Sequence, residues 1–343
     1  MDFLFSCDEN VVLTFGDCET SRISRVRFPI SHSICSRREE DIGVEMEVKS
    51  WAVKNLVTKL SSVSERSRTE AICELRIISK NDAESRPLIA DAGAIPYLAE
   101  SLYSSDKDCQ ENATAALHNL SISSKDALIS TRGLLDALSH ALRNPSSAFT
   151  AQCAASAIFS LLTVEDYRPI IGHKRDIVFG LIDIARNPNS ASRSIKDALK
   201  ALFGIALYPL NRSQIIELGA VPALFSLVCK DGRVGILEDV TAVIAQIAGC
   251  EESWEAFRKV SGVGVLVDLL DNSTGASNRT KENAVSALLN LVQCSGKEVT
   301  ESIRGLVLGA VDGIIEVAEN GSEKGRSKAM ALLKLLDVSS CEF

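Results

Sequence analysis

The sequence predicts an all-α protein, a right-handed α–α superhelix (solenoid) of about seven helical repeats, the first and last incomplete. Glycine ends a recurring segment at Gly93, Gly133, Gly219, Gly262 and Gly309, with spacings of 40, 86 (twice 43), 43 and 47 residues. Units of stacked helices repeat every 40–47 residues or so. The chain is also 46% hydrophobic but only 5% aromatic. Such a composition is typical of interiors filled by the small and aliphatic residues of packed helices.

The chain begins with a segment that shows no helical pattern. Residues 1–49 are rich in Ser, Arg and Glu, so we expect a flexible leader. From Trp51 onward apolar residues follow the helical period, with Val53, Leu56 and Leu60 on one face. The solenoid is therefore expected over residues 50–338, followed by a short tail over residues 339–343.

Each following unit has the same internal order. The terminal glycine precedes a helix that carries proline in its first turn, as at Pro96 and Pro222, where the missing N–H has no helical partner in any case. A polar loop then leads to an alanine-rich helix such as residues 111–120, whose small side chains let neighbouring helices approach closely. Neither helix can bury its apolar stripe alone, so the units must stack. The pattern is broken over residues 167–176, where Asp176 replaces the terminal glycine.

Charge and cysteine usage exclude several classes of protein. Lys and Arg number 37 against 45 Asp and Glu, a net charge of −8 that repels nucleic-acid phosphates. The N-terminus is acidic and no apolar run approaches the roughly 18 residues of a membrane span, so we expect neither a signal peptide nor membrane insertion. The ten cysteines are scattered singly, without a C-x-x-C pair, which fits a reducing compartment. We therefore expect a monomer in the cytosol or nucleus.

The residues that catalysis needs are not grouped in the sequence. The four histidines, His32, His118, His140 and His173, lie in four separate segments without an adjacent nucleophile or metal-ligand spacing. We accordingly predict no catalytic residues, no metal and no cofactor. The alternative, an enzyme with an unrecognised site, would require a deep pocket where a solenoid offers an open surface.

Four segments carry a resemblance to a known family. Residues 93–98, 110–122 and 281–291 resemble armadillo (ARM) repeats, and together with residues 74–81 they resemble the ARM region of plant U-box ubiquitin ligases. The likeness covers about residues 50–338. In those ligases a U-box before the repeats recruits the ubiquitin-conjugating enzyme, but residues 1–49 lack its Cys-Pro-Ile…Asp-Pro-Val pattern. The resemblance implies a non-catalytic scaffold that binds proteins or, alternatively, an adaptor or regulator in the ubiquitination pathway.

The resemblance also implies where a partner binds. In ARM proteins the last helix of each unit lines a concave groove, and positions 0, +3 and +7 share one helical face. In one unit these positions are Asn112, Ala115 and Asn119. The matching positions of later units are Cys153, Ser156, Ser160, Asp197, Lys200, Gly204, Asp239, Ala242, Gln246, Asn283, Ser286 and Asn290, and the last unit offers Ser327, Met330 and Lys334. We expect a protein or an extended peptide to bind along this face.

Two asparagines on this face have two possible roles. The amides of Asn119 and Asn290 can hydrogen-bond the backbone of a bound peptide, or they can satisfy a carbonyl between repeats. Nuclear-import receptors pair such asparagines with a tryptophan four residues earlier, where this chain has Ala115 and Ser286, so their cargo is not predicted here. Charges of both signs are mixed along the face, without a continuous stripe of one sign. This argues against a generic polybasic or polyacidic ligand and favours a folded partner or a peptide with its own charge pattern.

Overall fold

The computed structural model describes residues 39–294, 297–307 and 311–336. The chain divides into Met1–Gly43, of which only residues 39–43 are described, and Val44–Phe343. The described residues form 20 α-helices and two short 3₁₀ helices and contain no β-strand. The prediction of an all-α repeat fold is therefore confirmed.

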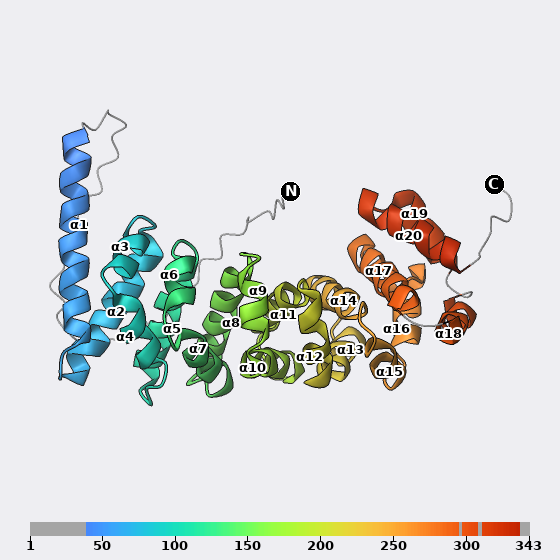
Figure 1. Cartoon of the computed structure of the whole chain (residues 1–343), viewed down its shortest axis with the longest axis horizontal. Helices are drawn as coiled ribbons and strands as arrows, with labels where there is room; N and C mark the ends of the chain where they lie inside the picture. The colour runs from blue at the N-terminus through green and yellow to red at the C-terminus, as the bar shows by residue number, and fades with distance from the viewer. Residues whose placement is uncertain (1–38, 295–296, 308–310, 337–343) are drawn as a thin grey trace. The chain divides into compact units, whose positions relative to one another are not determined.

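After a first set of two helices, which agrees with the predicted incomplete first unit, the helices repeat in sets of three, and Figure 1 shows their order along the chain. The last helix of each set, which we call the third helix, packs on the third helix of the next set. The third helices are α2 (Glu65–Asn81), α5 (Lys107–Ser121), α8 (Ala148–Leu162), α11 (Ser192–Ala206), α14 (Val234–Ile247), α17 (Asn278–Cys294) and α20 (Glu323–Leu335). Seven third helices agree with the predicted number of units.

A second row of helices lies beside the third helices. It comprises α1 (Glu39–Leu60), α4 (Ala94–Ser101), α7 (Leu134–Arg143), α10 (Arg175–Arg186), α13 (Ala220–Lys230), α16 (Gly262–Asp268) and α19 (Val311–Asn320). In Figure 1, α7, α10 and α13 lie along the lower side, and α8, α11 and α14 lie above them.

Shorter helices connect the two rows. They are α3 (Ser85–Asp91), α6 (Lys125–Ser130), α9 (Tyr167–Gly172), α12 (Arg212–Glu217), α15 (Ser253–Arg258) and α18 (Lys297–Val307), with 3₁₀ helices η1 (Pro209–Asn211) and η2 (Asn272–Thr274). The last unit has all three helices, contrary to the prediction that it is incomplete. Its first helix, α18, has few apolar residues, although Ile303 and Val307 are fully buried. Its marker, Gly309, lies outside the described residues.

The glycine markers work as expected in three units. Gly93, Gly133 and Gly219 adopt the left-handed backbone, with φ of 81°, 83° and 81°, directly before a second-row helix. Residues that have a Cβ atom rarely adopt this backbone conformation, so glycine is favoured there. In the next unit Ser261 takes it instead, with φ of 53°. Gly262 is the first residue of α16, and a Cβ on it would lie 2.6 Å from the Phe225 ring, so this glycine is required by packing.

Two further expectations need correction. In the irregular unit, the residue before α10 is Lys174, with φ of −77°, and Asp176 lies in the first turn of that helix. Asp176 accepts a charged hydrogen bond from Arg143 of α7 at 2.6 Å, so the second row continues through this unit. In addition, α1 begins at Glu39, within the segment expected to be a flexible leader. Its charged residues are good helix formers, and Glu45 and Lys49 pair one turn apart at 3.4 Å. The rest of the leader and the tail over 339–343 lie outside the described residues.

One continuous core runs through the repeats from Val53 to Leu336. Alanines of the third helices, among them Ala113, Ala154 and Ala198, are fully buried where neighbouring third helices meet. Serine or aspartate caps begin five of the third helices, for example Ser147, whose hydroxyl accepts from the Thr150 N–H at 3.2 Å. The side chains that point away from this core on the third helices form the surface considered next.

Candidate functional site

The surface formed by the third helices holds every position that the sequence predicts for partner binding. Four of these side chains are buried, namely Asn112, Ala115, Cys153 and Ser286. The half-buried ones are Asn119, Ser156, Ser160, Asp197, Lys200, Asp239, Gln246, Asn283 and Asn290, while Lys334 is exposed. The structure thus spreads the predicted residues along six helices, from α5 to α20, and most of their side chains are only partly exposed.

The two asparagines bond between repeats. Asn119 of α5 donates from Nδ2 to the Ser79 hydroxyl of α2 at 3.1 Å. Asn290 of α17 donates from Nδ2 to the Ala245 carbonyl of α14 at 2.7 Å. The amide nitrogens therefore serve the packing of adjacent third helices, which was one of the two predicted roles. Their carbonyl oxygens have no partner among the described residues and stay available as acceptors.

Other predicted positions join neighbouring third helices in the same way. Ser160 donates to the Ser121 carbonyl at 2.7 Å, and Asn283 donates to the Thr241 hydroxyl at 3.1 Å. Ser156 donates to a carboxylate oxygen of Asp197 at 2.9 Å. These hydrogen bonds connect units about 40 residues apart, so they fix the spacing of the helices that carry the surface.

One cluster on this surface was missed at the level of sequence. The guanidinium of Arg76 on α2 donates to Asn112 Oδ1 at 2.7 Å and lies 5.6 Å from the centre of the Phe149 ring on α8. Lys200 makes a similar contact, with its ammonium 5.9 Å from the centre of the Phe159 ring. Cations over aromatic faces attract the ring electrons. Arg76 belongs to the segment that carried the family resemblance, but its spacing gave no indication that it crosses to α8.

The titratable groups of this surface are perturbed mainly by burial. Burial raises the pKa of the Cys153 thiol to about 12, which leaves almost no thiolate to act as a nucleophile. Burial lowers the pKa of His118, whose Nδ1 is buried without a hydrogen-bond partner. Burial also raises the pKa of Asp239, although Lys200, Lys196 and Arg279 oppose this effect. None of these groups forms a nucleophile–base pair.

The described residues contain no cluster suited to a metal ion and one hollow large enough for a small molecule. Within residues 39–294, 297–307 and 311–336, no group of three or more His, Cys, Asp or Glu side chains could hold a metal ion. A hollow of about 650 Å³ lies between the start of α2 and the end of α4, lined by residues that include Glu65, Arg68, Tyr97 and Tyr103. Arg68 already donates to the Ser62 carbonyl at 2.8 Å. The hollow lies apart from the predicted binding positions.

A helix that crosses a bilayer needs about 20 predominantly apolar residues. Among the described helices, none by itself is long and apolar enough to cross a membrane. The segments Pro209–Glu217 and Ala220–Lys230 pass this test together, but they are bent by 81°.

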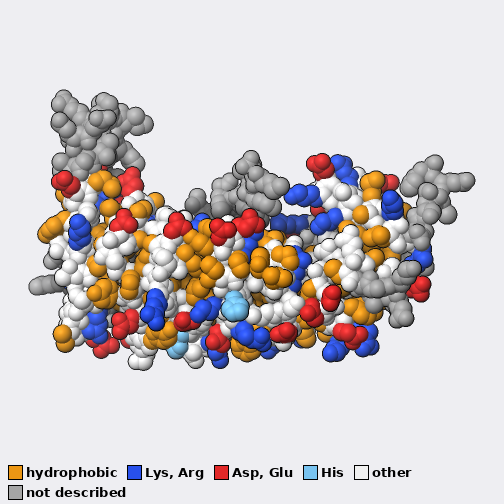
Figure 2. Space-filling view, viewed as in Figure 1, with side chains coloured by type: hydrophobic (Ala, Val, Ile, Leu, Met, Phe, Trp, Pro, Cys, Tyr) orange, Lys and Arg blue, Asp and Glu red, His pale blue; other side chains and the backbone are white. Residues whose placement is uncertain are grey.

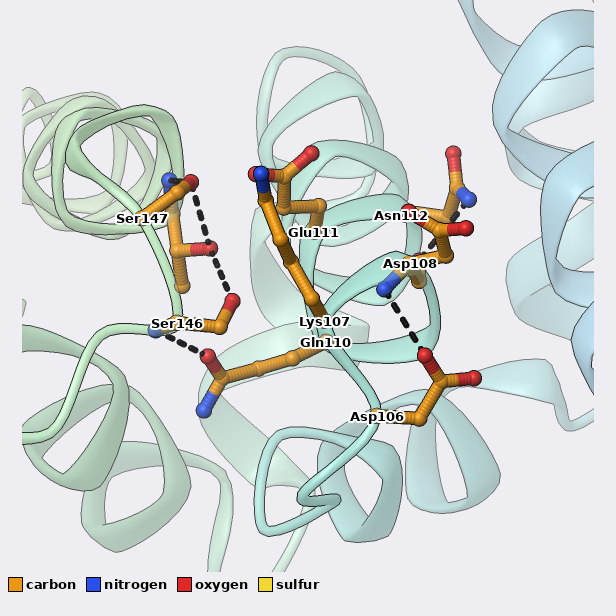
Figure 3. A network of polar contacts seen from close by, with 9 residues as sticks. Asp106, Lys107, Asp108, Gln110, Glu111, Asn112, Ser146 and Ser147 are labelled. Atoms are coloured by element: carbon orange, nitrogen blue, oxygen red, sulfur yellow. Dashed lines mark hydrogen bonds and ion pairs between the residues drawn. The ribbon is translucent and has the colours of Figure 1, made fainter.

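A buried glutamine connects the adjacent third helices α5 and α8, and Figure 3 shows its hydrogen bond to Ser146. Gln110 of α5 donates from Nε2 to the Leu102 carbonyl at 2.7 Å and to the Asn144 carbonyl at 3.3 Å. Its Oε1 accepts from the Ser146 N–H at 2.7 Å. One side chain therefore joins the end of α4, the end of α7 and the turn before α8, and it fixes α8 beside α5.

Known families and relatives match the chain over this region. The family model described as the plant U-box protein ARM repeat region matches residues 52–343. U-box domain-containing protein 18 of Arabidopsis thaliana is 29% identical over 289 residues, which cover 82% of this chain and 41% of the relative. U-box domain-containing protein 1 of Medicago truncatula is 32% identical over 82% of this chain and 40% of its own length. The chain thus spans about two fifths of these relatives.

Solved structures show the same architecture. A solved structure that concerns a phosphorylation switch in the interaction between cadherin and beta-catenin aligns with this chain with a TM-score of 0.69 and 18% identity. The alignment covers 88% of this chain and 59% of the other. An engineered protein aligns with a TM-score of 0.57 and 22% identity over 83% of this chain and 78% of its own. At these identities the likeness concerns the fold alone.

Proposed function

The chain belongs to the family of plant U-box protein ARM repeat regions, and we propose that it is a non-catalytic scaffold that binds a protein or an extended peptide on its third-helix surface. The observation that carries this proposal is the layer of half-buried polar side chains on adjacent third helices. Hydrogen bonds between repeats hold these side chains in place, so their free lone pairs are already oriented for a partner.

The chemistry of the surface supports binding over catalysis. Burial holds the Cys153 thiol in its neutral form. His118 Nδ1 and Asp239 Oδ2 have no hydrogen-bond partner among the described residues, so neither is paired with the other. Asn119 and Asn290 each keep a carbonyl oxygen that can accept from a peptide N–H. Such acceptors, repeated along a row of helices, match the backbone of an extended chain.

A photo-crosslinking experiment tests where a partner binds. A benzophenone amino acid is placed at Ala242, which is half-buried on α14 and makes no side-chain hydrogen bond, and separately at Asp183, which is exposed on α10 of the second row. The two proteins are irradiated in plant extract after their helicity and unfolding are shown to match the wild type. We expect a protein crosslinked to the Ala242 probe and absent from the Asp183 probe. The reverse pattern would place binding on the second row and refute the proposal.

Family membership favours a second, more specific function. The relatives in which this region occurs carry U-box names, so we propose as the alternative that the bound partner enters the ubiquitination pathway through this chain. The test is to follow ubiquitin conjugation to the crosslinked partner in plant extract with and without added chain. Unchanged conjugation at saturating chain would leave the scaffold function and remove this alternative.

A further inference from the structure

Three cations on α11 lie on the third-helix surface without an ion pair. Arg193, Lys196 and Lys200 occur at successive turns of one helical face, and within the described chain none makes a salt bridge. We call these three residues the α11 cationic patch. In Figure 2 the upper edge of the molecule carries Asp and Glu side chains over its middle part and Lys and Arg side chains toward the right.

Three cations on the second-row side of the molecule are paired between repeats. Arg143 contacts Asp176 at 2.6 Å, Lys174 contacts Asp136 at 2.6 Å, and Arg175 contacts Glu217 at 3.3 Å. All three pairs connect neighbouring units on the second-row side of the molecule. The α11 cationic patch differs from these three pairs in that none of its residues lies within ion-pair distance of a described carboxylate, although Lys196 and Lys200 act electrostatically on Asp239.

Of the two carboxylates next to the patch, one is hydrogen-bonded to another helix and the other makes no hydrogen bond from its buried oxygen. Asp197, between the patch residues on α11, accepts from the Ser156 hydroxyl at 2.9 Å. Asp239 on α14 has a buried Oδ2 and forms no ion pair with Lys196 or Lys200, although their charges act on it. Lys196 and Lys200 are half-buried, so they have lost part of their hydration without a full replacement. A carboxylate from outside the chain would supply that replacement.

One aromatic ring contacts the patch, and a second, Phe149, lies on the same third helix as that ring. Phe149 of α8 is 39% exposed, and Phe159 and Phe203 are partly buried against the core. Phe159 lies under the Lys200 ammonium. Since a long apolar side chain gains free energy by covering such rings, a ligand that has an apolar residue next to its acidic residues would contact both features.

We propose that the α11 cationic patch binds an acidic segment of a partner protein, through Asp or Glu side chains, while an adjacent aromatic or aliphatic residue of that segment packs on Phe149 and Phe159. The inference rests on the proposed scaffold function and adds the chemistry of the partner. Arg193 and Lys200 are seven residues apart, which is about 10 Å along the helix axis. Several carboxylates can span this distance, whereas a single phosphate group cannot.

The test uses peptides of defined charge. Three fluorescein-labelled peptides have the sequence Gly-Glu-Asp-Phe-Glu-Asp-Phe-Gly, the same sequence with Gln and Asn for Glu and Asp, and the same sequence with Lys for Glu and Asp. A fourth peptide replaces the acidic residues of the first by a single phosphoserine. Binding to the full chain is followed by fluorescence anisotropy, and we expect the acidic peptide to bind at least tenfold more tightly than the other three.

Matched variants locate the binding. Lys196→Glu/Lys200→Glu reverses two charges of the patch and should weaken the acidic peptide by tenfold or more while it strengthens the lysine peptide. The control, Lys54→Glu/Lys230→Glu, makes the same change at two exposed lysines of α1 and α13 and should leave both affinities within twofold of wild type. Helicity and urea unfolding of both variants are measured first.

Each outcome decides the proposal. The expected ranking with the charge swap supports it, because a folding defect cannot strengthen binding of the lysine peptide. Equal binding of acidic and lysine peptides, tighter binding of the phosphoserine peptide, or an equal loss in the control variant would overturn it. Crosslinking at Ala242 that persists when no acidic peptide binds would also overturn this inference, and it would leave the scaffold function standing.

Discussion

The buried glutamine of α5 offers a strong test of how the third helices are held in place. Gln110 is only 2% exposed and makes three hydrogen bonds to the backbone of two other segments. Leucine has a similar volume and no polar atoms, so Gln110→Leu removes the hydrogen bonds without leaving a cavity. The perturbation therefore isolates the polar contribution of one side chain.

The magnitude follows from what each partner loses. The Leu102 carbonyl belongs to a fully buried residue, and an unsatisfied buried acceptor costs about 1–3 kcal/mol. The Ser146 N–H and the Asn144 carbonyl lie in an exposed turn, where water replaces most of what is lost. Together these effects predict a free energy of unfolding about 2–3 kcal/mol lower than that of wild type.

Urea unfolding followed by far-UV circular dichroism measures this loss, and hydrogen exchange of the Ser146 amide measures its location. The matched control is Gln152→Leu on α8, because Gln152 is half-buried and its side chain makes no hydrogen bond to the described residues. The control should change stability by less than about 0.5 kcal/mol. If Gln110→Leu unfolds at the same urea concentration as the control, or if the Ser146 amide exchanges no faster, the reasoning is refuted.

Three further predictions concern packing, protonation and reactivity. Gly262→Ala should destabilise the chain by about 1–3 kcal/mol in urea unfolding, because the new methyl group meets the Phe225 ring, whereas Gly264→Ala, with open space around it, should not. Burial lowers the pKa of folded His118, so the unfolded chain binds more protons in acid. The contribution of His118 to the free energy of unfolding should therefore be constant above about pH 6.5 and fall as the pH drops below it. Urea unfolding at several pH values should show a smaller fall in His118→Gln. Alkylation by iodoacetamide at pH 8 should label exposed Cys229 and spare Cys153 until the chain unfolds, as peptide mass mapping would show.

The repeat and its helices could be predicted from sequence because their causes are local and periodic. Left-handed glycines such as Gly93 and Gly219 mark the same turn in successive units, and alanine-rich segments mark the third helices. The predictions were wrong where the residue type at one position does not determine the local structure. Ser261 adopts the left-handed conformation without being glycine, and Gly262 is glycine because of a ring from another helix. Likewise α1 extends to Glu39 through charged residues that carry no apolar stripe.

The helices chosen from sequence are the third helices of the structure, and binding at the positions chosen on them stays a prediction. The contacts on the third-helix surface could not be predicted, because they depend on how far a side chain reaches. Arg76 crosses from α2 to Phe149 on α8, past the helix between them. Gln110 begins the segment 110–122 that resembles an ARM repeat, but its place in that segment did not show that its side chain hydrogen-bonds the turn before α8. Periodicity gives the position of a residue along a helix and says nothing of its partner two units away.

The hydrogen bonds between third helices also show which strip of each helix can meet a partner. Residues at positions 0 and +7, such as Asn283 and Asn290, donate back to the preceding third helix, so that edge of the helix is occupied. Positions −4, −1 and +3 lie on one helical face slightly rotated from this edge. In α11 they are Arg193, Lys196 and Lys200, of which the first is exposed and the others half-buried, and none is ion-paired within the described chain. A partner that follows the row of third helices should therefore contact these positions first, and its acidic segment should lie at α11, because α5, α14 and α17 carry Glu111, Glu238 and Glu282 at position −1.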